Sequence, residues 1–193
     1  MNWDNAQKWE SDWWGNCANT LTEDLKQMTY TRLMGLSFIN YDGHLVIDLK
    51  EKSVIDIGGG PTSILLKCIN FSQGTVVDPC DYPQWTIDRY KSAGIEVKKL
   101  PGEELKDTEN VFDEVWIYNC LQHTQDPELI IKNAKKLGKT LRIFEWVDEA
   151  TNEGHPHMLT EEKLNDWIGQ KGSIIQLAEN ECFGKAYFGV FNL

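Results

Sequence analysis

Val54-Ile-Asp-Ile-Gly-Gly-Gly-Pro61 is the stretch of sequence that decides the fold. Apolar residues around Asp56 lead into three consecutive glycines, a pattern typical of a buried strand that ends in a tight turn. Glycines at such a place let the backbone approach a ligand closely. The stretch therefore predicts a ligand-binding crevice at the carboxyl end of a strand.

Short β-rich runs alternate with helical patterns along the rest of the chain. This alternation predicts strands over residues 53–57, 74–77, 95–100, 112–118 and 140–146. It predicts helices over residues 61–69, 85–93 and 127–137, and another that begins after Thr160. Residues 173–178 and 186–193 are expected to form an antiparallel pair. Because this alternation is typical of a parallel sheet with crossover helices, we expect a Rossmann-like domain with three layers, α/β/α.

A segment of different character precedes the sheet. It contains the aromatic run Trp9 to Trp14 and an amphipathic helical pattern that begins at Thr22. We expect residues 1–45 to form a helical and aromatic lid, with Trp14 over the ligand. Residues 53–193 would form the Rossmann-like core, and residues 1–193 a single domain. The alternative is that the segment only covers one edge of the sheet.

Composition excludes several classes of protein. The net charge of −11 argues against a nucleic-acid partner, because nucleic-acid binders normally carry a basic stripe. The sequence has no run of about 18 apolar residues and no signal-peptide pattern at its start. We therefore expect a cytoplasmic protein without membrane contact, as a monomer or homodimer. The five scattered cysteines form no C-x-x-C pair, and His155-Pro-His157 is read as a loop, so we expect no metal.

A second acidic residue refines the expected ligand. Asp78 ends the strand over residues 74–77, 22 residues after Asp56. A carboxylate at this place can accept hydrogen bonds from both hydroxyls of a ribose. The dinucleotide fingerprint G-x-G-x-x-G would need a glycine where the chain has Ser63, which disfavours NAD. The two acids and the glycine turn together indicate a ligand that contains adenosine.

Two segments resemble a known superfamily. Residues 54–61 are similar to the first motif of class I S-adenosylmethionine-dependent methyltransferases, and residues 111–127 (VFDEVWIYNCLQHTQDP) resemble the small-molecule, methyltransferase type 11-like branch. The resemblance spans about residues 53–137. It departs from the family pattern at Pro61-Thr62 and at Gly138. It implies S-adenosylmethionine as cofactor and a seven-stranded, mostly parallel sheet whose last strand is antiparallel.

The resemblance also implies roles for individual residues. Asp56 and the turn Gly58, Gly59 and Gly60 would lie at the methionine side of the cofactor. Asp78 would bind the ribose, and Glu103 would lie against the adenine. Asn119, at the end of the strand over residues 112–118, would line the pocket near the sulfonium.

The acceptor is less well defined by the sequence. Asn119-Cys-Leu-Gln122 lacks the proline-rich motif of nucleic-acid amino-methyltransferases, so we expect a small-molecule or saccharide-like (glycan) acceptor. Glu145, Trp146 and Asp148 lie at the carboxyl end of the fifth predicted strand. They could bind a hydroxylated ring, which favours O-methylation. A histidine could take the acceptor proton. The candidate bases are His123, His155 and His157.

The function expected from the sequence is therefore methyl transfer from S-adenosylmethionine to a small or saccharide-like acceptor. The rival interpretation is a cofactor-binding protein of the same fold without turnover, either a decoy or a regulatory subunit. The glycine turn and Asp78 favour cofactor binding in both cases.

Overall fold

The sheet of the protein is mostly parallel. The structure is a computed structural model that describes residues 3–105 and 112–193, so Val111 of the second motif lies outside the described residues. Within this part of the chain eight strands form one sheet with the order β4-β3-β2-β5-β6-β8-β7, and β1 pairs with β2 outside that path. The parallel strands are β2 (His44–Ile57), β3 (Cys68–Val77), β4 (Ile95–Lys98), β5 (Phe112–Tyr118) and β6 (Gly138–Trp146).

The last strand reverses direction. β8 (Cys182–Asn192) runs antiparallel to both β6 and β7 (Ser173–Glu179). The Rossmann-like sheet with an antiparallel last strand is thus confirmed, with β1 (Phe38–Tyr41) as an additional strand.

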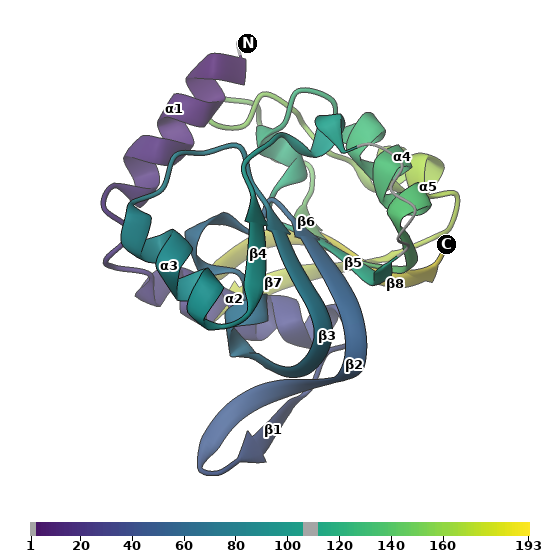
Figure 1. The fold of residues 1–193 in the computed structure, drawn as a ribbon. Helices are drawn as coiled ribbons and strands as arrows, with labels where there is room; N and C mark the ends of the chain where they lie inside the picture. Colours follow the sequence, from purple (N-terminus) through teal and green to yellow (C-terminus); the bar gives the residue numbers. More distant parts are fainter. Residues whose placement is uncertain (1–2, 106–111) are drawn as a thin grey trace.

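Helices cover both faces of the sheet (Figure 1). On one face lie α4 (Pro127–Leu137) and α5 (Glu161–Ile168), which pack side chains such as Ile131 and Leu164 into one apolar cluster. On the other face lie α2 (Leu21–Leu33) and α3 (Gln84–Ser92), which contribute Tyr30 and Tyr90 to a second cluster. The expected three layers are confirmed.

One predicted strand and two predicted helices agree closely with the structure. The predicted helices 85–93 and 127–137 and the predicted strand 112–118 match α3, α4 and β5 to within a residue at each end. β2, β3, β6 and β8 begin earlier than predicted. None of the helices in residues 3–105 and 112–193 is long and apolar enough to cross a membrane.

The helix predicted over residues 61–69 is wrong. Two 3₁₀ turns, Gly60–Thr62 and Ile64–Lys67, take its place, and β3 begins directly afterwards. Between the turns Ser63 has an extended backbone (φ −53°, ψ 146°), and its N–H donates to the Tyr90 hydroxyl at 2.7 Å. The N–H of Ile64 donates to the Tyr118 hydroxyl at 2.9 Å. Side-chain hydroxyls thus accept the hydrogen bonds of the segment, and pairing with β2 draws the following residues into a strand.

A hairpin not predicted from the sequence precedes the core. β1 and β2 are joined by Asp42 and Gly43, both with positive φ (50° and 81°), and project away from the rest of the sheet (Figure 1). An Asp-Gly pair between β-rich runs is a common two-residue hairpin turn, so the signal was present in the sequence.

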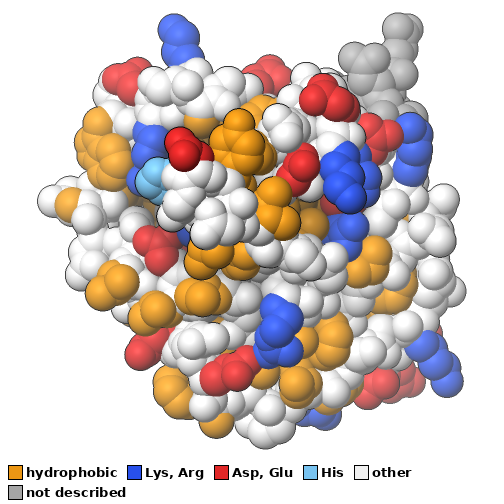
Figure 2. Space-filling view, turned by 90° about the horizontal axis from the view of Figure 1, so that it is seen from below, with side chains coloured by type: hydrophobic (Ala, Val, Ile, Leu, Met, Phe, Trp, Pro, Cys, Tyr) orange, Lys and Arg blue, Asp and Glu red, His pale blue; other side chains and the backbone are white. Residues whose placement is uncertain are grey.

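The surface seen from below carries acidic, basic and apolar side chains interspersed, without a continuous basic area on that face (Figure 2).

Candidate active site

The glycine turn at the end of β2 is closely packed on two sides. Gly58 has φ +77°, and a Cβ added to it would lie 2.1 Å from the Cys120 Sγ. A Cβ added to Gly59 would lie 2.6 Å from Asp56 Oδ2. Gly60 has φ +62°, and its Cβ would meet nothing nearer than the Trp14 ring at 3.7 Å. The first two glycines are therefore required by packing, whereas the third has room for a Cβ in ordinary contact with Trp14 and Tyr82.

Asp56 lies under this turn. It is fully buried, and its Oδ2 accepts hydrogen bonds from the Ser63 and Tyr118 hydroxyls, the latter at 2.7 Å. Its Oδ1 is buried and has no hydrogen-bond partner among the described residues. Burial raises the pKa of Asp56 to about 7. The carboxyl group therefore supports the turn from below, and its contact with the methionine side of the cofactor stays a prediction.

Asp78, at the end of β3, is tied to the same turn. Its Oδ2 accepts a hydrogen bond from the N–H of Gly60 at 3.0 Å. Its Oδ1 accepts from the N–H of Cys80 and from the Tyr82 hydroxyl, each at 3.0 Å. Burial raises the pKa of Asp78. One lone pair of Oδ2 remains for a ligand, because each carboxylate oxygen accepts two hydrogen bonds.

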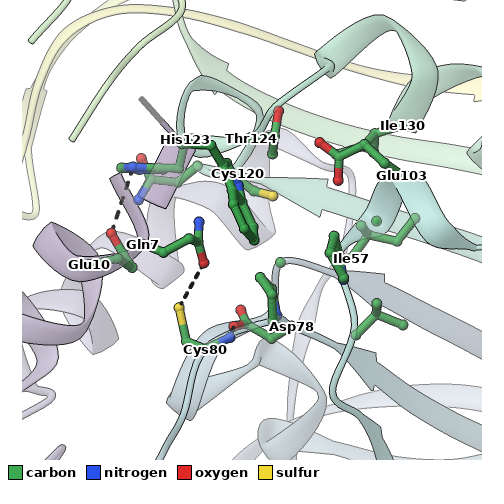
Figure 3. A pocket seen from close by; sticks show the side chains of 17 residues that line it. Gln7, Glu10, Ile57, Asp78, Cys80, Glu103, Cys120, His123, Thr124 and Ile130 are labelled. Atoms are coloured by element: carbon green, nitrogen blue, oxygen red, sulfur yellow. Dashed lines mark hydrogen bonds and ion pairs between the residues drawn. The ribbon is translucent and has the colours of Figure 1, made fainter. Parts of the chain in front are cut away.

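A cavity opens beside the turn, and we call it the turn cavity (Figure 3). Its volume is about 510 Å³ including its mouth, a size usual for small-molecule sites. Polar walls come from Asp78, Glu103 and Asn119, and apolar walls from residues that include Ile57, Val77 and Ile130. The structure thus brings Gly58, Asp78, Glu103 and Asn119 together, as the sequence predicted.

Glu103 is held by the loop before α4. Its Oε1 accepts hydrogen bonds from the N–H groups of Gln125 and Asp126 at 2.8 and 3.0 Å. Asn119 has φ +51°, and its Oδ1 accepts a hydrogen bond from Gln122 at 3.3 Å. Both side chains are therefore fixed by contacts with the protein while they line the turn cavity.

The N-terminal helix α1 (Trp3–Trp14) lies across the carboxyl end of the sheet (Figure 1). Trp3, Gln7 and Glu10 line the turn cavity, and the Gln7 Oε1 accepts a hydrogen bond from the Cys80 thiol at 3.2 Å. Trp14 lies over Gly60, and its indole N–H donates to Glu10 at 2.7 Å. The segment thus covers the glycine turn, which is the position expected for a lid.

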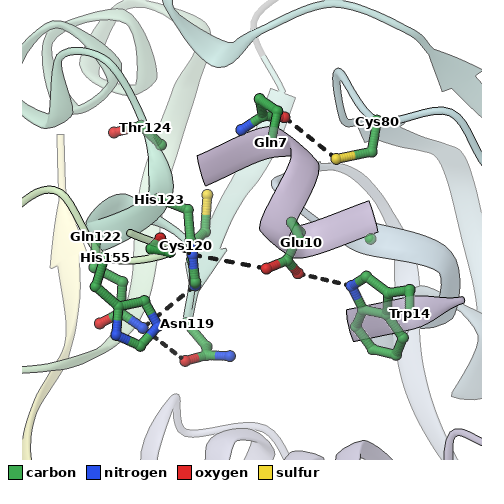
Figure 4. A network of polar contacts seen from close by, with 12 residues as sticks. Gln7, Glu10, Trp14, Cys80, Asn119, Cys120, Gln122, His123, Thr124 and His155 are labelled. Atoms are coloured by element: carbon green, nitrogen blue, oxygen red, sulfur yellow. Dashed lines mark hydrogen bonds and ion pairs between the residues drawn. The ribbon is translucent and has the colours of Figure 1, made fainter. Parts of the chain in front are cut away.

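A second cavity, the tryptophan cavity, adjoins the first. It has a volume of about 790 Å³ including its mouth. Glu10, Asn119 and His123 line both cavities, so these three residues form the shared wall. Glu10 lies between Trp14 and His123, with 3.7 Å between its Oε2 and the histidine Nδ1 (Figure 4).

Two of the three predicted histidines lie in the tryptophan cavity. His123 donates from Nδ1 to the Gly154 carbonyl at 2.8 Å, which leaves its Nε2 without a proton in the neutral ring. The centroids of the His123 and His155 rings are 4.6 Å apart. Burial lowers the pKa of each to about 4, so both rings are neutral at pH 7 and are weak bases.

The third histidine and two of the acids expected near the acceptor lie elsewhere. His157 donates to the Thr124 carbonyl at 2.9 Å and lines neither cavity. Glu145 is fully buried and accepts hydrogen bonds from the N–H groups of Cys120 and Leu121, both at 3.1 Å. Asp148 pairs with Lys185 at 2.7 Å. Of Glu145, Trp146 and Asp148, only Trp146 lines the tryptophan cavity. Glu145 points under the loop after β5.

In the part of the chain that the structure describes, no group of three or more His, Cys, Asp or Glu side chains could hold a metal ion.

The sequence analysis missed Gln7 and Glu10 as site residues and the helix that carries them. Trp3, Gln7, Glu10 and Trp14 are spaced by four, three and four residues, which places them on one face of a helix. That spacing was the available signal, and the density of tryptophans obscured it.

The buried carboxyl groups predict a pH-dependent stability. Burial raises the pKa of Glu145 to about 8 and that of Asp56 to about 7, from ordinary values of 4.5 and 3.8. Between pH 6.5 and 8 the folded state therefore holds protons that the unfolded chain has released, so the free energy of unfolding should fall as the pH rises. Urea unfolding at several pH values measures this slope.

Glu145→Gln provides the control for that slope. The amide keeps an oxygen for the N–H groups of Cys120 and Leu121 but does not titrate. The fall in stability should be shallower in this variant. Stability that rises over the window, or a slope that the variant leaves unchanged, would contradict the assignment.

The comparisons with known proteins bear on the fold. Neither protein-family models nor curated proteins match the chain. Among solved structures it is similar to the N-methyltransferase NodS from Bradyrhizobium japonicum WM9, which was crystallised with S-adenosylhomocysteine. The identity is 14%, 98% of each chain is covered and the TM-score is 0.65.

Two further structures have comparable scores. A methyltransferase described as a possible histamine N-methyltransferase, from Thermotoga maritima, has 16% identity and a TM-score of 0.60 over 98% of this chain and 92% of its own. The 1,6-didemethyltoxoflavin-N1-methyltransferase of Burkholderia thailandensis, with bound substrate and S-adenosylhomocysteine, has 13% identity and a TM-score of 0.61 over 97% and 83%. Such low identities establish the fold alone. The protein has the fold of class I S-adenosylmethionine-dependent methyltransferases, as the sequence resemblance predicted.

Proposed function

We propose that the protein is an enzyme that transfers the methyl group of S-adenosylmethionine to a small-molecule acceptor. The observation that carries the proposal is the pair of adjoining cavities. The turn cavity lies beside the glycine turn, and the tryptophan cavity meets it at Glu10, Asn119 and His123. Direct transfer between two molecules requires them to be held against each other, which two cavities with a shared wall allow.

The residues of the turn cavity fit the cofactor. A smaller hollow that shares Asp78 with the turn cavity is lined by Gly60 and Trp14, and it lets a ligand approach the backbone of the turn. Asp78 keeps a lone pair for a ribose hydroxyl, and the apolar walls with Glu103 suit a purine ring. When bound, the cofactor would supply a methyl group activated by a positively charged sulfur. Two of the structural neighbours hold S-adenosylhomocysteine.

The protein's own residues would bind, orient and exclude water. Helix α1 covers the turn, and Trp14 closes the space over Gly60. Asn119, fixed by Gln122, faces both cavities. His123 and His155 would orient the acceptor as neutral hydrogen-bonding rings rather than as strong bases, because their pKa values lie near 4. We assign no contact with the acceptor to His157.

The structure also bears on which kind of acceptor receives the methyl group. The sequence favoured oxygen on a saccharide-like molecule partly because of Glu145 and Asp148. Neither side chain lines the tryptophan cavity, so that argument loses its support. We retain a small-molecule acceptor, no longer favour a saccharide, and propose no nucleic-acid partner.

Binding of S-adenosylhomocysteine tests the proposal. Calorimetry should give a dissociation constant in the micromolar range, about 8 kcal/mol of binding free energy. Trp14→Ala should weaken binding about tenfold, because the ring over Gly60 is lost. It should also reduce the change in tryptophan fluorescence on binding.

The neighbouring Trp13 offers a matched control. Its side chain is 61% exposed, and unlike Trp14 it does not line the hollow over Gly60, so Trp13→Ala should leave the affinity nearly unchanged. Equal affinities of wild type and Trp14→Ala would show that Trp14 does not contact the cofactor. Absence of binding in the wild type would refute the proposal itself.

The alternative is a protein that binds the cofactor without turnover. The presence of the second cavity at the shared wall favours an enzyme. Transfer of labelled methyl from S-adenosylmethionine to any member of an acceptor panel separates the two, because the alternative predicts binding without label transfer.

A further inference from the structure

The tryptophan cavity has an unusual combination of lining residues. Its aromatic side chains include Trp9, Trp13, Trp14, Trp146 and Phe183. Its charged side chains are four glutamates and one lysine: Glu10, Glu23, Glu149, Glu181 and Lys26. Two histidines, His123 and His155, also line the cavity and are neutral at pH 7. The cavity is therefore aromatic and negatively charged at once.

We propose that the acceptor is an amine, which binds in the tryptophan cavity as a cation with an apolar or aromatic body and is methylated on nitrogen. This inference rests on the proposed function of the turn cavity and adds the chemical class of the acceptor. Aromatic faces and carboxylates are the two groups that attract ammonium ions in proteins.

Trp9 lies beside two other rings of the cavity. The rings of Trp9 and Trp13 are stacked with centroids 5.7 Å apart, and Trp9 meets the edge of His155 at the same distance. Phe183 and Trp13 are more than 60% exposed, so they stand at the mouth of the cavity. An acceptor with an apolar body would cover these rings, which would otherwise remain in water.

The carboxyl groups come from four separate parts of the chain. Glu10 lies on α1 and Glu23 on α2, while Glu149 follows β6 and Glu181 lies between β7 and β8. The Glu23 side chain is only 13% exposed, and its ion pair with Lys26 is long, at 3.8 Å. One lysine balances one of the four carboxylates at most, so the cavity keeps a negative potential that favours a cation and opposes a phosphate or a carboxylate ligand.

These carboxyl groups are also poised to exchange protons with a bound amine. Burial raises the pKa of Glu23 to about 7 and raises the pKa of Glu10 and of Glu149 as well. A fraction of the carboxyl groups therefore carries a proton at pH 7 in the free protein. An ammonium ion bound among them favours their charged form, so its binding should release protons.

The carboxyl groups account for the proton that the amine must lose before methyl transfer. The bound ammonium gives a proton to a carboxylate of the cavity. Glu10 is the candidate for this role, because it is the only one of the four glutamates that also lines the turn cavity. The nitrogen lone pair then forms a bond to the methyl carbon while the bond from that carbon to sulfur breaks. The electron pair of that bond stays on sulfur and gives S-adenosylhomocysteine, and the proton passes to water. No oxidant or further reactant is needed.

A pair of isosteric probes tests the charge preference without requiring turnover. Phenethylamine and 2-phenylethanol differ only in ammonium against hydroxyl. With the protein saturated by S-adenosylhomocysteine, phenethylamine should bind about tenfold more tightly. Titrations in two buffers of different ionisation enthalpy should show proton release for the amine and none for the alcohol. Glucosamine and glucose form a second pair, which tests a saccharide body.

Variants connect the effect to the cavity. Glu23→Gln and Glu149→Gln should each lower phenethylamine affinity about threefold or more, and Glu23→Gln should reduce the proton release. Both should leave 2-phenylethanol binding unchanged. Glu128→Gln is the matched control, because it removes the same charge from an exposed position on α4 outside both cavities and should change neither ligand.

The outcomes separate this inference from the proposed function. If S-adenosylhomocysteine binds but the amine and the alcohol bind equally, or both fail to bind, the amine inference is overturned and the proposed function stands. If the alcohol or glucose accepts labelled methyl and the amines do not, the acceptor atom is oxygen and the inference is likewise overturned. If S-adenosylhomocysteine does not bind, the proposed function fails first.

Discussion

Gly58→Ala is expected to lower the free energy of unfolding by about 3 kcal/mol or more. Two causes add at this position. The backbone has φ +77°, which costs an L-residue about 1 kcal/mol. The new methyl group would lie 2.1 Å from the Cys120 Sγ and 2.7 Å from its Cβ, so the loop after β5 must move. Urea unfolding of the variant measures the loss.

Gly43→Ala separates the two causes. Gly43 has a similar φ of +81°, but a Cβ there would have no heavy atom within 4 Å. This variant should therefore lose about 1 kcal/mol, the backbone cost alone. If both variants lose the same free energy of unfolding, the contact between the turn and Cys120 is not a tight one. In Gly58→Ala protein that remains folded, displacement of Cys120 should also weaken cofactor binding, since Asn119 precedes it.

The sequence predicted the order of strands and helices well because local signals and the fold agree. Pro127 after Asp126 marks the beginning of α4, and the Asp126 side chain accepts the N–H of Leu129 as an N-cap should. The helix predicted after the glycine turn is wrong because there the local signals and the fold disagree. Its apolar residues suit a helix, but hydroxyls of Tyr90 and Tyr118, distant in sequence, accept its N–H groups. Such long-range partners leave no local signal.

In the candidate site, too, some features could be predicted from the sequence and others could not. Gly58, Asp78 and Asn119 could be predicted because they end neighbouring parallel strands, and these ends meet at one edge of a sheet. The direction of a side chain at that edge could not be predicted. Glu145 ends β6 at this edge, yet it turns under the loop and binds the N–H groups of Cys120 and Leu121. Glu10 escaped notice because its position depends on how α1 docks on the sheet.

Asp78→Ala is expected to weaken binding of S-adenosylhomocysteine by one to two orders of magnitude. The charged acceptor for a ribose hydroxyl is lost, and hydrogen bonds to charged groups are among the stronger ones. The N–H of Gly60 also loses its partner at the centre of the turn. Calorimetry at fixed pH and salt measures the change. Asp78→Asn, which keeps the shape and one oxygen, should give a smaller loss.

Tyr82→Phe distinguishes the ribose contact from support of the turn. The Tyr82 hydroxyl donates to Asp78 at 3.0 Å, so the variant loosens the carboxylate without removing its charge. If Asp78 contacts the ribose, Tyr82→Phe should cost only a few-fold in affinity, far less than Asp78→Ala. If instead Asp78 acts only by holding Gly60, the loss in Asp78→Ala should follow its loss of folding stability. Unchanged affinity in a well-folded Asp78→Ala protein would remove Asp78 from the cofactor site altogether.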